Sequence, residues 1–251
     1  MRTGDGYGEL LRDALEQGGE MLEIVERDDG FIMASRFGPQ AYLAPFAKWP
    51  SRQRRALRLA RGRVLDVGAG AGRVALHLQE KGHDVVAIDA SPGAVEICRR
   101  RGINDARVLR VEDVDESLGI FDTVVMYGNN LGLLAARTKA RRLLRRLHGV
   151  TSERGRIVGE CLDPYDGAGP EHLAYHERNR QQGRMGGQIR IRIRYRDIAT
   201  PWFDYLFVSR EELEELVSGT GWRLARTFED DPPLYVAVIE KEPRAPASRT
   251  G

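Results

Sequence analysis

The sequence predicts an α/β fold with a doubly wound, seven-stranded and mostly parallel sheet whose last strand is antiparallel. Between residues 63 and 160, five short apolar runs alternate with helical patterns, which is typical of a parallel sheet with helices on both faces. The 251 residues are 41% apolar, which is enough for one sizeable core. An N-terminal flap and an antiparallel hairpin inserted after the fifth strand complete the predicted fold.

The N-terminal segment, residues 1–61, predicts a helix, a hairpin and a flap. Residues 1–8 are rich in glycine and are expected to be disordered. Helical spacing over residues 9–17 predicts a helix that stops at Gly18-Gly19, and two apolar runs around Asp28-Asp29-Gly30 predict a hairpin. The aromatic residues that follow either pack on the main domain or form part of the cover over a ligand site: Phe37, Tyr42, Phe46 and Trp49.

Residues 62–162 form the regular part of the pattern. Ser91 before Pro92 is an N-cap followed by proline at the first helical position. In such sheets, ligands lie beyond the carboxyl ends of the strands at the switch point. A helix over residues 52–60 leads into this part. Strands are predicted over residues 63–67, 84–88, 106–111, 121–126 and 156–160, and helices over residues 71–81, 91–101 and 133–147.

Residues 163–208 break this rhythm and predict an inserted cap. A weak helical pattern covers residues 171–182. Strict alternation over residues 188–196 predicts a half-buried antiparallel strand, with residues 201–208 as its partner. Its apolar face needs the main domain or another protomer to pack on. The other face carries an arginine ladder, Arg190, Arg192, Arg194 and Arg196. These arginines either pair with nearby Glu and Asp on a solvated face or face an anionic substrate, a nucleic acid or a partner subunit.

Residues 209–241 predict the end of the core. Ser209 and Glu212 form a capping box that opens a helix through Val217, and residues 221–224 and 235–239 predict the last two strands. Residues 242–251 predict a disordered tail.

A glycine-rich loop, Gly68-Ala69-Gly70-Ala71-Gly72, joins the first strand of the sheet to its helix. Its glycines let backbone N–H groups approach a nucleotide ligand, and the following helix directs its positive end toward that ligand. A dinucleotide loop usually has a third glycine at the position of Arg73. Because Arg73 fits the close helix–strand contact badly, an NAD-linked oxidoreductase is disfavoured.

The ordered motifs resemble class I S-adenosylmethionine (SAM) methyltransferases. Asp66 precedes the glycines by two residues, Asp89 ends the second strand, Asp113 follows the third, and Phe121-Asp122 begins the fourth. The resemblance covers residues 60–162 and 206–241. It implies a Rossmann-like core at residues 62–162, SAM as methyl donor and S-adenosyl-L-homocysteine as product.

The resemblance also implies which residues hold the donor. Asp89 would accept hydrogen bonds from both ribose hydroxyls, and Asp113 would accept one from the adenine amino group. Glu112 and Asp115 compete with Asp113 for that role. The implied cofactor residues are Asp66, Gly68, Ala69, Gly70, Gly72, Asp89, Ala90, Asp113, Val114, Tyr127 and Gly128.

We expect methyl transfer by SN2 displacement to a small-molecule acceptor, at nitrogen or oxygen rather than carbon. The sequence Gly128-Asn129-Asn130 lacks the prolines of enzymes that methylate exocyclic base amines or glutamine amides. Whether the acceptor needs a protein base stays open. The 163–208 insertion and the N-terminal flap are expected to cover the acceptor. The candidate catalytic residues are Tyr127, Asn129, Glu160, His172 and His176, with Asp163 and Tyr165 near them.

Two alternatives remain. One is a methyltransferase that acts on RNA or protein, in which a basic stripe and the arginine ladder would serve tRNA or rRNA. The other is a SAM-binding module without catalysis. The net charge of +2, from 39 basic and 37 acidic residues, gives no global attraction for nucleic acid, so that partner is not favoured. The stripe comprises Arg141, Arg142, Arg145 and Arg146.

The histidines, the cysteines and the lack of long apolar runs give expectations about metal binding and cellular location. His172 and His176 lie four residues apart but lack a third ligand in sequence reach, so no metal is expected. Cys98 and Cys161 are expected to be reduced core residues of a cytoplasmic protein. We expect no signal peptide and no membrane span, and a monomer or a homodimer.

Overall fold

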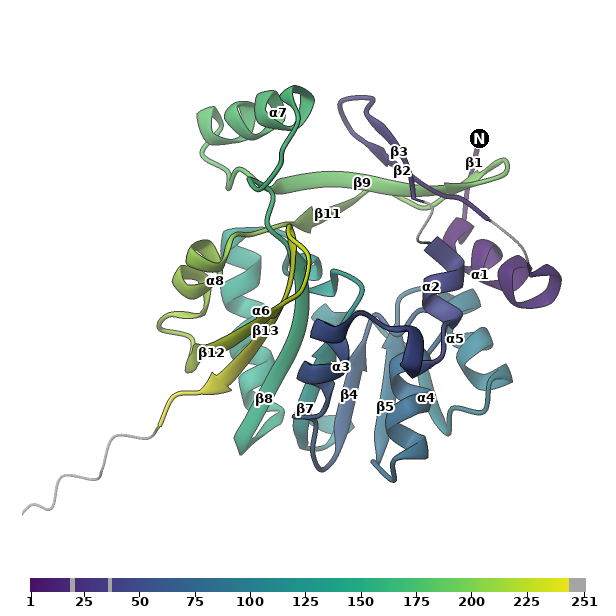
Figure 1. Cartoon of the computed structure of the whole chain (residues 1–251), viewed down its shortest axis with the longest axis vertical. Helices are drawn as coiled ribbons and strands as arrows, with labels where there is room; N and C mark the ends of the chain where they lie inside the picture. The colour runs from purple at the N-terminus through teal and green to yellow at the C-terminus, as the bar shows by residue number, and fades with distance from the viewer. Residues whose placement is uncertain (19–20, 36–37, 244–251) are drawn as a thin grey trace, which may run out of the picture.

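The computed structural model describes residues 1–18, 21–35 and 38–243, and two sheets organise these residues (Figure 1). Within the described residues, the main sheet has seven strands in the order β12-β13-β8-β7-β4-β5-β6. Its members are β4 (Val64–Val67), β5 (Val85–Asp89), β6 (Asp105–Val108), β7 (Phe121–Met126), β8 (Thr151–Leu162), β12 (Trp222–Glu229) and β13 (Leu234–Lys241).

Strands β4 to β8 are mutually parallel, while β13 is antiparallel to β8 and β12 is antiparallel to β13. The predicted doubly wound sheet with an antiparallel last strand is confirmed. The chain runs from β4 outward to β5 and β6, and then returns to β7 on the other side of β4. The carboxyl ends of β4 and β7 therefore lie side by side at the switch point, where this fold class binds ligands.

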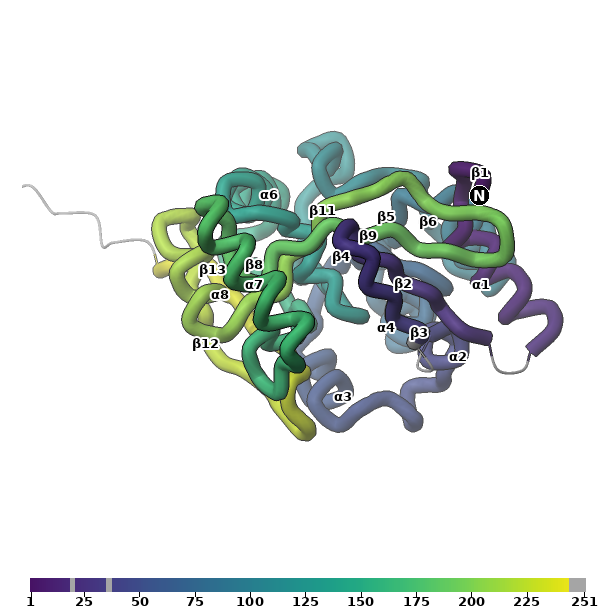
Figure 2. The backbone as a smooth tube through the Cα atoms, turned by 90° about the horizontal axis from the view of Figure 1, so that it is seen from above, coloured from purple at the N-terminus to yellow at the C-terminus, as the bar shows by residue number. Residues whose placement is uncertain are grey.

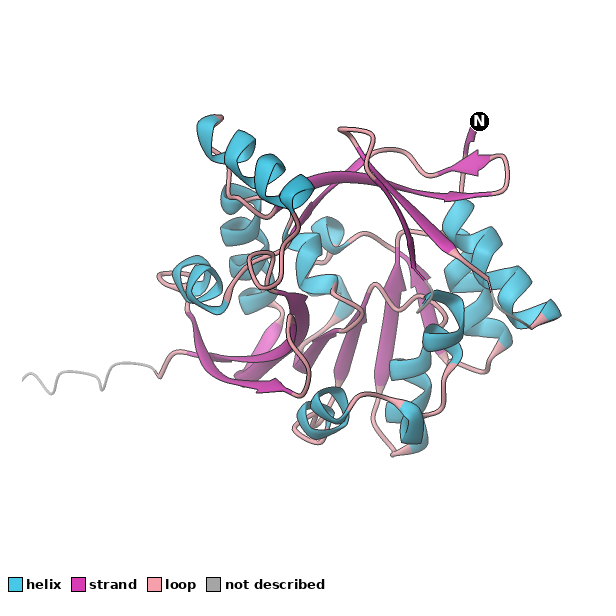
Figure 3. Cartoon of the chain, turned by 45° about the horizontal axis from the view of Figure 1, so that its top comes forward, coloured by secondary structure: helices cyan, strands magenta, loops and turns pink. Residues whose placement is uncertain are grey.

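Alternating side chains of the central strands feed two hydrophobic cores, one on each face of the main sheet. Leu65 and Val67 pack in the core that holds α6 and α8, while Val64 packs in the core that holds α3, α4 and α5. Figure 3 shows these helices around the strands. The helices are α3 (Ser51–Leu57), α4 (Arg73–Glu80), α5 (Pro92–Arg100), α6 (Arg137–Gly149) and α8 (Arg210–Val217).

The second sheet joins segments that are far apart in the chain. Strand β9 is its centre: it pairs with β2 on one side, with Val25 opposite Ile193, and with β11 on the other, with Tyr205 opposite Ile189. The predicted antiparallel hairpin of the insertion is thus confirmed. Seen from above, β9, β2 and β11 cross over the main body (Figure 2). The strands of the second sheet are β1 (Arg2–Thr3), β2 (Glu23–Arg27), β3 (Ile32–Ser35), β9 (Gln188–Tyr195), β10 (Ile198–Ala199) and β11 (Phe203–Leu206).

Three further helices flank the second sheet: α1 (Gly6–Gln17), α2 (Gly38–Leu43) and α7 (Pro170–Gln181). The expectation of disorder over residues 1–8 is wrong, because β1 pairs with β10 and Asp5 anchors the start of α1. The Asp5 carboxylate accepts hydrogen bonds from the backbone N of Gly8 at 2.9 Å and from Oγ of Ser91 at 2.8 Å. The predictions for Gly19, Phe37 and the tail from residue 244 lie outside the described residues.

Candidate functional site

The glycine-rich loop closes the carboxyl end of β4. Gly68 has φ +69° and Gly70 has φ +56°, a region that glycine adopts without a Cβ penalty. Space is also limiting: a Cβ on Gly68 would lie 2.3 Å from Nδ2 of Asn130, and a Cβ on Gly70 would lie 2.7 Å from Oη of Tyr7. Asn130 Nδ2 donates to the carbonyl oxygens of Val67 and Gly68 at 3.1 and 2.8 Å. These bonds tie the loop to the segment after β7.

Two buried carboxylates brace the loop. Oδ2 of Asp66 accepts a hydrogen bond from the backbone N of Ala75 at 3.1 Å and fixes the first turn of α4. Asp89 accepts from the backbone N of Gly70 and of Ser91, both at 2.9 Å. Burial raises the pKa of both carboxyls, that of Asp66 to about 7, against the opposing effect of these N–H donors.

The segment after β7 is fixed to both halves of the molecule. Oη of Tyr127 donates to the carbonyl oxygen of Gln53 at 2.8 Å, on the main-domain side. The carbonyl oxygen of Asn129 accepts a hydrogen bond from Oη of Tyr205 at 2.7 Å, on the side of the second sheet. Two candidate catalytic residues, Tyr127 and Asn129, therefore lie on a braced segment.

Glu160, another catalytic candidate, is a buried brace. Its side chain is 2% exposed, and both of its oxygens accept hydrogen bonds from Nε2 of Gln53 at 2.8 Å. It also pairs with Arg52 at 3.2 Å and accepts a hydrogen bond from the backbone N of Gly128 at 2.9 Å. Glu160 does not line the cavity described next. It holds the segment after β7 in position from outside the cavity.

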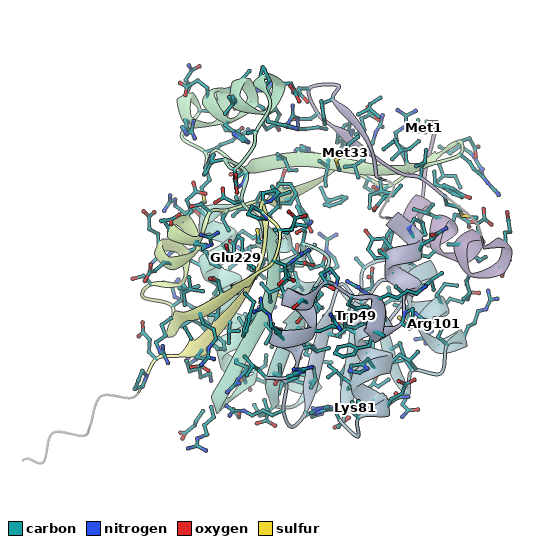
Figure 4. All side chains as sticks on the ribbon, viewed as in Figure 1. Met1, Met33, Trp49, Lys81, Arg101 and Glu229 are labelled. Atoms are coloured by element: carbon teal, nitrogen blue, oxygen red, sulfur yellow. The ribbon has the colours of Figure 1, made fainter. Side chains whose placement is uncertain are left out.

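A cavity of about 810 Å³ lies between the carboxyl edge of the main sheet and the second sheet. Figure 4 labels Met33 on the upper sheet, and Met33 lines this cavity. The apolar side chains of the second sheet and its connections form a roof. Predicted site residues on the floor are Asp66, Gly68, Ala69, Gly70, Asp89, Ala90, Tyr127, Gly128 and Asn129, and the roof contains Val25, Met33, Ile189, Ile191, Ile193, Trp202, Phe203, Tyr205 and Phe207.

Three predicted cofactor residues lie away from the cavity. Gly72 is the N-cap of α4, where a Cβ would lie 2.1 Å from Cδ1 of Ile103, so this glycine serves helix packing. Val114 is fully buried in the main core and Asp113 is exposed. The cavity is lined instead by the residues just before them, 109–112.

The two histidines of α7 also lie outside the cavity. Nδ1 of His172 lies 3.0 Å from Nη1 of Arg27, and the buried ring of His176 packs on Tyr165 at 5.4 Å. Burial, with Arg180 beside it, lowers the pKa of His176 to about 4. Tyr165 and Asp163 do not line the cavity either. The described residues contain no group of three or more His, Cys, Asp or Glu arranged to hold a metal ion.

Glu23, Tyr42 and Arg73 also line the cavity, and none of them is among the predicted cofactor or catalytic residues. Glu23 is 7% exposed and accepts a hydrogen bond from Oη of Tyr42 at 2.9 Å. The guanidinium of Arg73 lies 4.6 Å from the ring centre of Trp49 and forms no ion pair with a described residue. Glu23 could not be told from Glu26 by sequence, because both stand in the same short strand.

Comparison with known proteins identifies the same core. A family model described as a methyltransferase domain matches residues 64–155. A glycine/sarcosine N-methyltransferase from Parasynechococcus marenigrum is 25% identical over 72% of this chain and 72% of its own length. A ubiquinone biosynthesis O-methyltransferase from Xanthomonas oryzae is 42% identical, but over 27% of this chain and 31% of its own length.

A solved structure extends the likeness beyond this core. A SAM-dependent methyltransferase from Bacteroides fragilis, in complex with S-adenosyl-L-homocysteine, has a TM-score of 0.77 and 26% identity, covering 94% of both chains. The likeness therefore includes the second sheet as well as the core. None of the helices in the described part of the chain is long and apolar enough to cross a membrane.

Proposed function

Since the chain belongs to the class I SAM-dependent methyltransferases, we propose that it transfers the methyl group of SAM to a nitrogen or oxygen atom of a small molecule bound beneath the second sheet. One observation carries this proposal. A single cavity has the glycine loop on one wall and the apolar side chains of the second sheet on the other. A donor and an acceptor bound in one cavity can react directly, because their orientation is fixed by both walls.

We assign the ribose of the donor to Asp89. A carboxylate offers about four lone-pair sites, and the backbone N–H groups of Gly70 and Ser91 use one site on each oxygen. Two sites remain for the two ribose hydroxyls. Gly68 and Gly70 present bare backbone to the amino-acid part of the donor, because no Cβ fits there.

We assign the base and the carboxylate of the donor to residues on either side of Asp89. The base would lie against Leu109 and Val111, which line the cavity, in place of Asp113 and Val114. Arg73 follows the glycine loop and lines the same cavity without an ion pair to a described residue. Its charge and the N-terminal turn of α4 suit the carboxylate of the donor.

The lining of the other wall suits a small, largely apolar acceptor. Aliphatic and aromatic side chains dominate the roof, and polar groups come from Glu23, Tyr42, Arg190, Thr200 and Asp204. A few polar groups among apolar ones are typical of small-molecule sites, which commonly enclose 300–1,000 Å³. Because the donor shares the volume of about 810 Å³, the space left for the acceptor is limited.

Internal pairing of the basic residues also favours a small molecule over RNA. In the stripe on α6, Arg141 donates to the carbonyl oxygen of Ser218 at 2.7 Å and Arg145 donates to that of Gly219 at 3.4 Å. In the arginine ladder, Arg192 and Arg194 both pair with Glu26. Arg141 and Arg145 have fewer N–H donors left for phosphates, and the charges of Arg192 and Arg194 are partly offset by Glu26.

The chain's contribution to the reaction is alignment and exclusion of water. Bound SAM supplies a methyl group on a positively charged sulfur. In-line displacement needs the reacting atoms held in register in a desolvated site. The braced residues Tyr127 and Asn129 form a fixed floor, and the buried side chains of Ile191 and Tyr205, each 8% exposed, cover it.

Two measurements test the proposed function. Calorimetry with the full chain should detect SAM binding. Methyl-labelled SAM is then incubated with the chain and a cell extract, which is filtered into small molecules and macromolecules. We expect label in the small-molecule fraction. Label confined to RNA or protein, or bound SAM that never loses its methyl group, would overturn the proposal, and the second result would indicate a SAM-binding module.

A further inference from the structure

Glu23 and Glu26 stand on the same strand and have opposite surroundings. They are three residues apart on β2, so their side chains lie on opposite faces of the sheet. Glu26 is neutralised by Arg192, at 2.9 and 3.0 Å, and by Arg194 at 3.2 Å. Glu23 lines the cavity, is 7% exposed and has no ion pair with a described residue. A buried carboxylate without a cation is costly, and such groups are concentrated at functional sites.

Tyr42 links Glu23 to the floor of the cavity. Oη of Tyr42 donates to Oε2 of Glu23 at 2.9 Å, and no described residue donates to Oε1. The Tyr42 ring also lies over the segment after β7, where a Cβ on Gly128 would be 3.9 Å from Cε1 of the ring. Gly128 is at the carboxyl end of β7, where the methyl group of the donor is expected. The free oxygen of Glu23 is therefore in the acceptor half of the cavity, close to the floor.

Among the described residues, the titratable groups that interact with Glu23 are three phenols. Tyr42 comes from α2, Tyr7 from α1 and Tyr205 from β11, and burial raises the pKa of all three. Burial also raises the pKa of Glu23, while the hydrogen bond from Tyr42 opposes that shift. A carboxylate in such surroundings accepts a proton more readily than one in water.

We propose that Glu23 is the general base of methyl transfer and that Tyr42 is its positioning residue. The inference rests on the proposed function and narrows its substrate to an acceptor nitrogen or oxygen that carries a proton to be lost. A lone pair of that atom forms the bond to the methyl carbon, and the carbon–sulfur bond breaks with its electron pair going to sulfur. The acceptor's proton passes to Oε1 of Glu23, so charge and atoms balance.

Glu23→Gln is the test, with Glu26→Gln as the matched control on the same strand. Both variants and the wild type receive methyl-labelled SAM and two acceptor probes: 4-nitrophenol at a pH where it is ionised, and 4-methoxyphenol, which keeps its proton. With 4-methoxyphenol, Glu23→Gln should lower kcat about 100-fold or more, the usual scale for a general base. With ionised 4-nitrophenol its rate should stay near that of the wild type. The control should resemble the wild type with both probes.

The outcome separates this inference from the proposed function. If SAM fails to bind the wild type in calorimetry, the proposed function fails. If SAM binds all three proteins alike and Glu23→Gln methylates 4-methoxyphenol at the wild-type rate, Glu23 is not the base. Equal losses with both phenols would also overturn the inference, because they would indicate a structural role.

If neither phenol is methylated, a pH titration of the Glu23 carboxyl group tests the assignment of Glu23 as the base. With carboxyl-¹³C glutamate and bound S-adenosyl-L-homocysteine, the Glu23 signal, identified by its loss in Glu23→Gln, should titrate above the ordinary glutamate value. Tyr42→Phe should move its midpoint higher still, because the hydrogen bond that favours the ionised form is gone. An ordinary midpoint that Tyr42→Phe does not move would overturn the assignment.

Discussion

The floor and the roof of the cavity are built in different ways. The floor is held by short hydrogen bonds between residues of the glycine loop and the strand ends next to it, such as Asp89 to Gly70 and Asn130 to Gly68. The roof is held by cross-strand pairing of β2 with β9, as in the ion pair of Glu26 with Arg192. We therefore expect substitutions in the roof to leave donor binding unchanged, except at Tyr205, which donates to the carbonyl oxygen of Asn129 on the floor. Specificity is expected to vary in the roof.

The largest loss of stability is expected on removing Glu160, whose buried side chain holds the segment after β7 in place. Glu160→Ala leaves the buried charge of Arg52 without a partner, and breaking a buried pair in this way costs about 3–5 kcal/mol of stability. Urea unfolding measures this loss. Glu240→Ala, which removes partly exposed pairs with Arg156 and Arg223, should cost about 1 kcal/mol or less. Similar losses in the two variants would contradict the bracing role.

A smaller effect is expected for the donor contact itself. Asp89→Ala should weaken SAM binding by about 1.5–3 kcal/mol, the scale of hydrogen bonds that involve a charged group. Calorimetry measures the change, and circular dichroism checks that the variant is folded. Unchanged affinity in a folded variant would mean that the ribose does not bind at Asp89.

A substitution in the roof should affect acceptor binding rather than SAM binding. Ile191→Ala removes part of the apolar wall, so the KM of the acceptor should rise on the order of 10-fold. SAM affinity should stay within about twofold, because we assign the donor to the floor. A similar loss of SAM affinity would show that the floor and the roof are coupled, and would contradict their separate roles in donor and acceptor binding.

The smallest effect on activity is expected at His176, outside the cavity. Below its ordinary pKa of 6.5 the unfolded chain gains a proton that the folded chain takes up only near pH 4. The free energy of unfolding should therefore fall as pH falls from about 6.5 to about 4. His176→Phe should flatten that slope in urea titrations and leave the pH profile of methyl transfer unchanged. A shifted activity profile would bring α7 into the site.

Local patterns predicted the strands well where burial is uniform. The strand over residues 121–126 matches β7 to the residue, because its apolar run is bounded on both sides. Strand β8 is longer than predicted, Thr151–Leu162 instead of residues 156–160, because pairing with β7 and β13 continues past the apolar run. Helix α6 starts at Arg137 rather than at residue 133, because a 3-10 turn and the left-handed Ala135 precede it.

The sequence by itself determined the sheet, the donor loop and the methyl donor. The individual strands and the donor loop depend on residues that are close in the chain, namely apolar runs, glycines that adopt positive φ and acids that brace the turn beside them. The ordered motifs indicate the methyl donor by resemblance. Only the tertiary structure decided the acceptor half and the assignments of Glu160, His172 and His176. Glu23 and Ile191 are more than 160 residues apart in the chain, and the pairing of β2 with β9 brings both of them to the same cavity. Periodicity records which face of a strand is apolar, but not which distant strand lies beside it.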